Sequence, residues 1–168
     1  MIADTKIRRR RRKSQGGDSM IETSLLLVPL LAMVLGIMDM GMAFFVHNTF
    51  QNAVREGSRF ATTWQVRAGY GQIGSIRDVV RQYSMGFINT TNMTTYVNVR
   101  FYNPITLVEQ VGAGSNSPGN LVEVSIESYN WGFMAPIQRN ITAFSLTTRS
   151  ASRLEPLAPG VAPPALNP

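Results

Sequence analysis

The chain has 168 residues, of which 44% are hydrophobic and 15% are charged, and its formal net charge is +6. This length fits one domain with an appended segment, and the lack of cysteine excludes a disulfide scaffold, a thiolate metal site and a cysteine nucleophile. The one histidine, His47, excludes multi-histidine zinc sites and the usual Ser-His-Asp triad. We therefore predict no metal, no cofactor and no catalytic activity.

The excess positive charge lies at the N-terminus. Residues 1–17 hold seven basic residues and one acidic residue, which gives +6, whereas the rest of the chain holds nine of each, which gives 0. A nucleic-acid arm would mix aromatic residues with its basic ones, so we predict a topology anchor beside a membrane and no nucleic-acid partner. The basic residues are Lys6, Arg8, Arg9, Arg10, Arg11, Arg12 and Lys13.

An apolar segment follows this leader, from residue 21 to residue 46. Its charged residues are Glu22 and Asp39 alone, and its apolar side chains leave no polar face on a helix. The uncharged residues 23–38 span roughly 24 Å, and the whole segment exceeds the ~30 Å hydrocarbon core of a bilayer. A secretory signal peptide would have a shorter apolar region and a clear cleavage site. We therefore predict a transmembrane helix over residues 18–46.

The charges on either side of this helix predict its orientation. Cytoplasmic flanks are enriched in basic residues, which places residues 1–17 in the cytoplasm and residues 47–153 on the far side as an extracytoplasmic domain. Five of the nine prolines lie in residues 154–168, which we expect to form an extended or disordered tail.

Helical spacing of apolar residues continues beyond the membrane segment, through residues 47–66. Ala53, Gly57 and Ala61 are four residues apart there and form a ridge of small side chains, on which another helix or the protein's own sheet could pack closely. A second helix is predicted over Ser75–Phe87, with Ser75 as its cap.

The second half of the chain changes from a helical to an alternating pattern. Alternation predicts strands over residues 97–101 and 121–129, and a less regular strand with room for a bulge over residues 141–148. A loop is predicted at residues 112–120. A short extended piece at residues 105–108 is expected to pair with the chain on the other side of this loop. The predicted fold class is α+β, with a long N-terminal helix, a short second helix and an antiparallel sheet of three or four strands.

A GxGxxG pattern runs from Gly69 to Gly74. A dinucleotide site would need a strand before this pattern and an acidic residue about 20 positions after it. Here the end of a predicted helix precedes the pattern, and residues 89–98 contain no acid. The pattern therefore predicts a flexible loop.

A carboxylate one turn into an apolar helix is costly, about 2.5–3.5 kcal/mol on insertion scales at the bilayer centre. Glu22 could simply remain hydrated at the interface. Removal of the leader after Gly17, however, would give Asp18 a new α-amine one helical turn from Glu22. The two charges could then neutralise each other, within one chain or between neighbouring chains of a bundle.

The order of these features resembles the TadE-like family of tight-adherence (Tad/Flp) pilus systems. The resemblance covers residues 16–61, a little over a quarter of the chain. It consists of the glycine–glutamate signal after a basic leader, Pro29 after an apolar run, GIMDMG at residues 36–41 and QNAVREGSR at residues 51–59. Asp18 and Thr23 depart from the family's pattern, and they leave open whether the leader is cut after Gly16, after Gly17 or not at all.

The resemblance implies a minor pilin or pseudopilin of the bacterial inner membrane, cleaved by a prepilin peptidase that recognises Gly17, Asp18 and Glu22. Its expected partners are the peptidase, other pilin-like subunits, the inner-membrane assembly platform and membrane lipid. Pro29 removes a helix hydrogen bond and lets the helix bend, and for Asp39 we favour a hydrated residue near the far interface. The positions expected to pack helices together are Pro29, Ala32, Gly36, Asp39, Ala53, Gly57 and Ala61.

Two other interpretations stay open. One is a pseudopilin of a type II secretion-like system, against which the motifs at residues 36–41 and 51–59 argue. The other is an unprocessed membrane anchor with an extracytoplasmic ligand-binding domain. In that case the sheet should contain an apolar pocket, and Glu22→Ala should leave the function intact.

Overall fold

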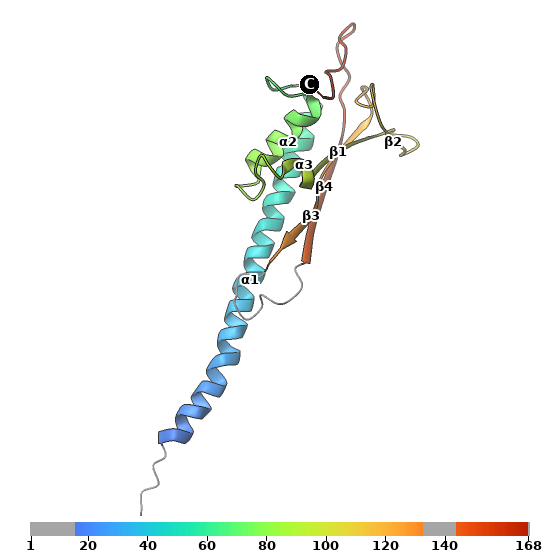
Figure 1. Cartoon of the computed structure of the whole chain (residues 1–168). Coiled ribbons are helices and arrows are strands. Elements are labelled where there is room, and N and C mark those ends of the chain that lie inside the picture. Colours follow the sequence, from blue (N-terminus) through green and yellow to red (C-terminus); the bar gives the residue numbers. More distant parts are fainter. Residues whose placement is uncertain (1–15, 133–143, 168) are drawn as a thin grey trace, which may run out of the picture.

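The structure of the chain, a computed structural model, describes residues 16–132 and 144–167. Figure 1 shows a long helix, α1, whose C-terminal half lies along a small sheet, whereas its N-terminal half extends away from the sheet. Two shorter helices, α2 and α3, precede the first strand in the chain. The fold class is α+β, which confirms the prediction.

Helix α1 spans Gly16–Thr62, a length of 47 residues, and passes through Pro29. Its side chains are exposed or half-buried from residue 19 to residue 38, and buried positions recur from residue 39 onward. The predicted continuation of the helix beyond the membrane segment is confirmed, although α1 ends four residues before the predicted end at residue 66.

The sheet contains four antiparallel strands in the order β2-β1-β3-β4. Their bounds are Val97–Tyr102 for β1, Glu109–Gln110 for β2, Leu121–Trp131 for β3 and Phe144–Arg153 for β4. The first three residues of the predicted strand 141–148 lie outside the described residues.

One face of α1 and the inner face of this sheet form the core. Phe50 of α1 is fully buried, and its ring packs edge-on against Phe87 at 6.1 Å and against Tyr129 at 4.8 Å between centroids. Such pairs add about 0.5–1.5 kcal/mol to the burial of apolar surface. The core therefore fixes the C-terminal half of α1 rigidly to the sheet. The other fully buried side chains include Val46, Val54, Val97, Val122, Val124 and Ile126.

Helix α2 spans Gln72–Tyr83, so it starts three residues before the predicted helix and ends four residues before its predicted end. Ser75 is not the cap: it lies inside α2, where its hydroxyl donates to the carbonyl of Gly71 at 2.8 Å. The helix stops because Met85 and Gly86 have positive φ angles. Helix α3, Met93–Tyr96, is a single turn that the sequence pattern did not indicate.

The C-terminal tail contacts the start of α2. The backbone N–H groups of Gln72 and Ile73 donate to the carbonyls of Ala165 and Leu166 at 2.9 and 3.1 Å. These two donors have no partner within their own helix, so the tail satisfies them. The described residues of the tail form no helix or strand, but they are held against the domain.

Two details of the predicted sheet are wrong. Residues 105–108 belong to the loop between β1 and β2 instead of an extended piece, and the side-chain oxygen of Asn103 accepts from the N–H groups of Ile105 and Thr106 in the turn of this loop. The bulge lies in β3, where the register shifts between Ile126 and Tyr129, and not in the strand that follows.

Candidate functional site along the N-terminal helix

The predicted processing positions lie at the start of α1. Gly17 and Asp18 belong to its first turn, and Glu22 follows one turn later with its side chain exposed. The helical backbone therefore keeps Glu22 at the i+4 position from Asp18, as the proposed pairing of charges requires. The basic anchor, Arg8, Arg9, Arg10, Arg11, Arg12 and Lys13, lies outside the described residues.

The next part of α1 is suited to a lipid environment. It is the one helix of the described chain that is long and apolar enough to cross a membrane. From residue 19 to residue 38 it covers roughly 30 Å, the thickness of a hydrocarbon core. The hydroxyls of Thr23 and Ser24 donate to the carbonyls of Ser19 and Met20, each at 2.8 Å, so these polar groups are satisfied within the helix.

Asp39 is not the hydrated residue that we expected. Asp39 is only 4% exposed, and it is the first buried residue of α1 from residue 19 onward. The sequence places Asp39 near the end of an apolar segment, but the helix continues to Thr62, and buried positions recur along it from residue 39 onward. Asp39 therefore marks the junction between the exposed half of α1 and the domain.

The small residues of α1 fall into two groups. Ala32 and Gly36 lie in the N-terminal half of α1, and their contact with a second helix stays a prediction. Ala53, Gly57 and Ala61 are buried within the domain. A Cβ atom at Gly57 would lie 2.6 Å from Cγ2 of Val80 on α2 and 3.3 Å from Cγ1 of Val124 on β3. This ridge is thus filled by the protein's own helix and sheet.

The segment at residues 51–59 has a buried face and a polar face. Ser58 is buried and its hydroxyl lies 3.0 Å from that of Ser150 on β4. Asn52 and Arg55 are exposed, and the side chain of Arg59 is 78% exposed beside Glu56. The small and apolar residues of this segment hold the domain on α1, and its polar residues remain available to other molecules.

A groove of about 420 Å³ borders this face between α1 and α2, with Phe60 and Val79 among the residues that line it. Glu56 and Arg59 of α1 and Gln82 and Tyr83 of α2 line it, together with Arg67 from the connection between the two helices. The groove is open, and no three His, Cys, Asp or Glu side chains of the described residues are grouped as a metal ion would require.

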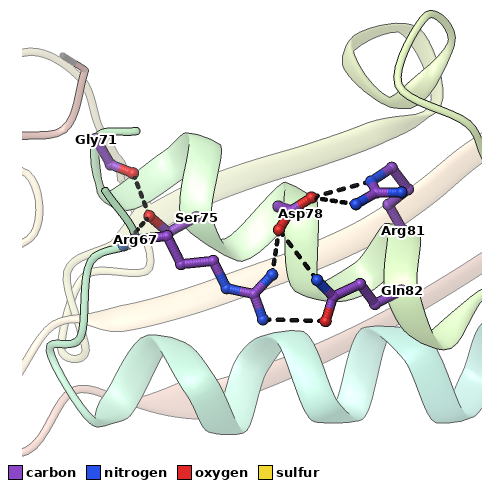
Figure 2. Close-up of polar contacts among 6 residues, drawn as sticks. All are labelled: Arg67, Gly71, Ser75, Asp78, Arg81 and Gln82. Carbon is purple, nitrogen blue, oxygen red and sulfur yellow. Dashed lines mark hydrogen bonds and ion pairs between the residues drawn. The ribbon is translucent and has the colours of Figure 1, made fainter. Parts of the chain in front are cut away.

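A buried carboxylate, Asp78, organises the polar contacts behind this groove (Figure 2). Arg81 donates to one of its oxygens through Nε and Nη2 at 2.9 and 2.7 Å, and Nη1 of Arg67 donates to the other oxygen. Gln82 bridges the two partners, since it donates to Asp78 at 3.3 Å and accepts from Arg67 at 3.1 Å. Arg67 lies in the connection after α1, so the cluster ties this connection to α2.

Burial raises the pKa of Asp78, but the hydrogen bonds and positive charges of Arg81 and Arg67 together outweigh this effect and hold the pKa below its ordinary value. Asp78 is therefore an ionised structural anchor and not a proton donor at neutral pH. Sequence inspection missed it, although Asp78 and Arg81 have the i, i+3 spacing of a helical ion pair.

A second ion pair lies across β1 and β3. Arg100 donates to both oxygens of Glu127 at 2.6 and 3.0 Å, and Ser125 donates to the same carboxylate at 2.9 Å. The bond from Arg100 is the main cause that lowers the pKa of Glu127. Arg100 on β1 and Glu127 on β3 are polar positions of the alternating strands, and each supplies the hydrogen-bond partner of the other.

The comparison with protein families matches residues 17–59 to the family described as TadE-like protein. These residues are TadE-like. The match confirms the resemblance and spans the start of α1, its exposed apolar half and the segment that packs on the sheet. No curated protein and no solved structure matches the chain.

The TadE-like match associates the chain with the tight-adherence pilus system, whose other components include pilin-like subunits. The apolar half of α1 agrees with a membrane-anchored component of that system. The match ends at residue 59, so α2 and the sheet lie outside it.

Proposed function

We propose that this protein is a minor pilin or pseudopilin that acts in the assembly of a tight-adherence pilus, without catalytic activity of its own. One observation carries the proposal: Glu22 lies one turn into an exposed apolar helix that continues without a break into a folded domain. A membrane anchor alone needs no carboxylate at that depth, because the charge only weakens insertion. A subunit that packs among similar helices can use it.

Processing by a prepilin peptidase would create the partner of this carboxylate. Cleavage after Gly17 gives Asp18 a positively charged α-amine, and the helix places that amine one turn from Glu22. In a lipid environment each charge lowers the cost of burying the other. The amine of one subunit could equally pair with Glu22 of its neighbour, which would set the axial register between subunits.

We further propose that residues 1–17 lie in the cytoplasm and the α+β domain on the other side of the inner membrane. The basic leader supports this orientation. The partners would be the prepilin peptidase, other pilin-like subunits and the inner-membrane assembly platform. The alternative of a ligand-binding anchor gains less support, because α1 covers the inner face of the sheet and fills it with Phe50 and its neighbours.

We expect Glu22→Ala to abolish the contribution of this protein to pilus assembly. Cells that lack the chain would be complemented with the wild type, with Glu22→Ala or with Ser24→Ala, and pili would be counted by electron microscopy. Ser24 is the matched control, since its hydroxyl only bonds to its own helix. The wild type and Ser24→Ala should restore pili. With Glu22→Ala, the number of pili should stay as low as in cells that lack the chain.

Equal membrane levels of the three proteins, measured by immunoblot, would show that the variants insert. Full restoration of pili by Glu22→Ala would contradict the proposed role of the carboxylate. Normal pili in cells that lack the chain would contradict the proposed function as a whole.

A further inference from the structure

The apolar surface of α1 does not end where the domain begins. Beyond the buried Asp39, apolar side chains on the open side of the helix stay exposed, and Phe44 and Phe45 are 62% and 47% exposed. From Met20 to Phe45 the exposed apolar surface extends for roughly 39 Å, about 9 Å more than a hydrocarbon core. The first two turns of α1 within the domain are therefore apolar on the outside.

A second element reaches the same level from α2. This helix packs against α1, with Val80 beside Gly57, and the turn after it brings Met85 next to Thr49, with Sδ 3.9 Å from the hydroxyl. In the same turn, the ring of Phe87 packs edge-on against Phe45 at 6.4 Å between centroids. Met85 itself is 70% exposed, beside Phe45, which is 47% exposed.

The side chains around Phe45 and Met85 change character with distance from the apolar half of α1. Next to them lie the neutral polar groups of Asn48 and Asn52 and the amphipathic Tyr83, which is 45% exposed. The first exposed charge beyond them along α1 is Arg55. Along this surface, apolar side chains are followed by neutral polar and aromatic ones and then by charged ones. A bilayer has the same order of environments from its hydrocarbon core to water, and aromatic side chains prefer the headgroup level.

We propose that the turn after α2, residues 84–87, inserts Met85 into the outer headgroup region of the membrane beside Phe45. The domain then rests on lipid through two elements and does not stand on α1 alone. We assign lipid as the partner of the surface around Phe45 and Met85, because this surface carries no charge and continues the apolar surface of the membrane-spanning half of α1. The proposal relies on the transmembrane placement of α1 in the proposed function. Contact with two elements would fix the tilt and rotation of the domain relative to the membrane.

Single cysteines can test this placement cleanly, because the natural chain contains none. Met85→Cys, Met33→Cys and Val111→Cys would each be labelled with an environment-sensitive fluorophore in the full chain and reconstituted into phosphatidylcholine–phosphatidylglycerol vesicles. All three side chains are well exposed, so labelling should leave the core intact. Met33 reports on the spanning segment, and Val111, beyond the short edge strand β2, reports on a part of the domain outside the proposed contact.

We expect blue-shifted emission at positions 33 and 85, and a loss of fluorescence at both when the vesicles contain lipids spin-labelled close to the headgroup. Position 111 should show neither change. If position 33 is quenched and position 85 behaves like position 111, the inference is wrong although the transmembrane placement holds. Blue-shifted emission at position 85 without quenching by lipid would also overturn it, since a second protein would then cover Met85. If position 33 is not quenched, the transmembrane placement itself fails, and the inference with it.

Discussion

Gly57→Leu is expected to destabilise the domain by about 3 kcal/mol or more, because the site has no room for a side chain. A Cβ atom there already lies 2.6 Å from Val80 Cγ2 and 3.3 Å from Val124 Cγ1, and both valines are fully buried. Valine has few alternative rotamers, so neither side chain can move aside cheaply. The loss is a large share of the ~5–15 kcal/mol that stabilises a typical domain.

The measurement is thermal unfolding of the full chain in detergent micelles, followed by near-UV circular dichroism. The matched control is Gly41→Leu in the same helix, where a Cβ atom meets nothing within 4 Å. We expect the midpoint to fall by about 10 °C or more for Gly57→Leu and to stay unchanged or rise for Gly41→Leu. Equal midpoints for the two variants would contradict the close packing of α1 on α2 and β3.

Asp78→Asn is expected to cost about 3 kcal/mol, because it leaves two arginines without their buried counter-charge. The side chain of Asp78 is 9% exposed, and Arg67 and Arg81 both bond to it. The control is Glu56→Gln, which removes an i, i+3 partner of the exposed Arg59 and should cost less than about 1 kcal/mol. Denaturant unfolding of the full chain would compare the two losses.

The effect of Asp78→Asn should also depend on pH. Folding lowers the pKa of Asp78 below its ordinary value of 3.8, so the ionised carboxylate stabilises the folded state fully above that value. This contribution is lost as the pH falls through the still lower pKa of the folded state. The difference in stability between the wild type and Asp78→Asn should therefore shrink below pH 3.8. A difference that stays constant with pH would show that charge is not the cause.

Local patterns were enough to predict the elements that depend on local sequence. The apolar run predicted the exposed half of α1, and strict alternation predicted β1 and most of β3. The small residues Ala53, Gly57 and Ala61 indicated close packing, but two outcomes were open, and the structure shows the ridge filled by α2 and β3. A pattern of small residues indicates that another element packs closely on the helix, but it does not identify that element.

Other features depend on contacts between distant parts of the chain. Helix α2 starts at Gln72 because Ala165 and Leu166, more than ninety positions away, accept from its first N–H groups. Asp39 is buried in the folded structure, which its apolar neighbours in the sequence could not show. The irregular pattern of β4 has a similar cause, since Ser150 faces inward to meet Ser58. These positions follow the tertiary structure and not the local pattern.

The most direct test of the proposed function is the intact mass and N-terminal sequence of the membrane-bound protein, isolated with and without an active prepilin peptidase. We expect a chain that begins at Asp18, or at Gly17 if the cut follows Gly16, and only when the peptidase is present. A leader that stays attached while the same peptidase cleaves another pilin-like subunit in those cells would show that the proposed processing does not occur.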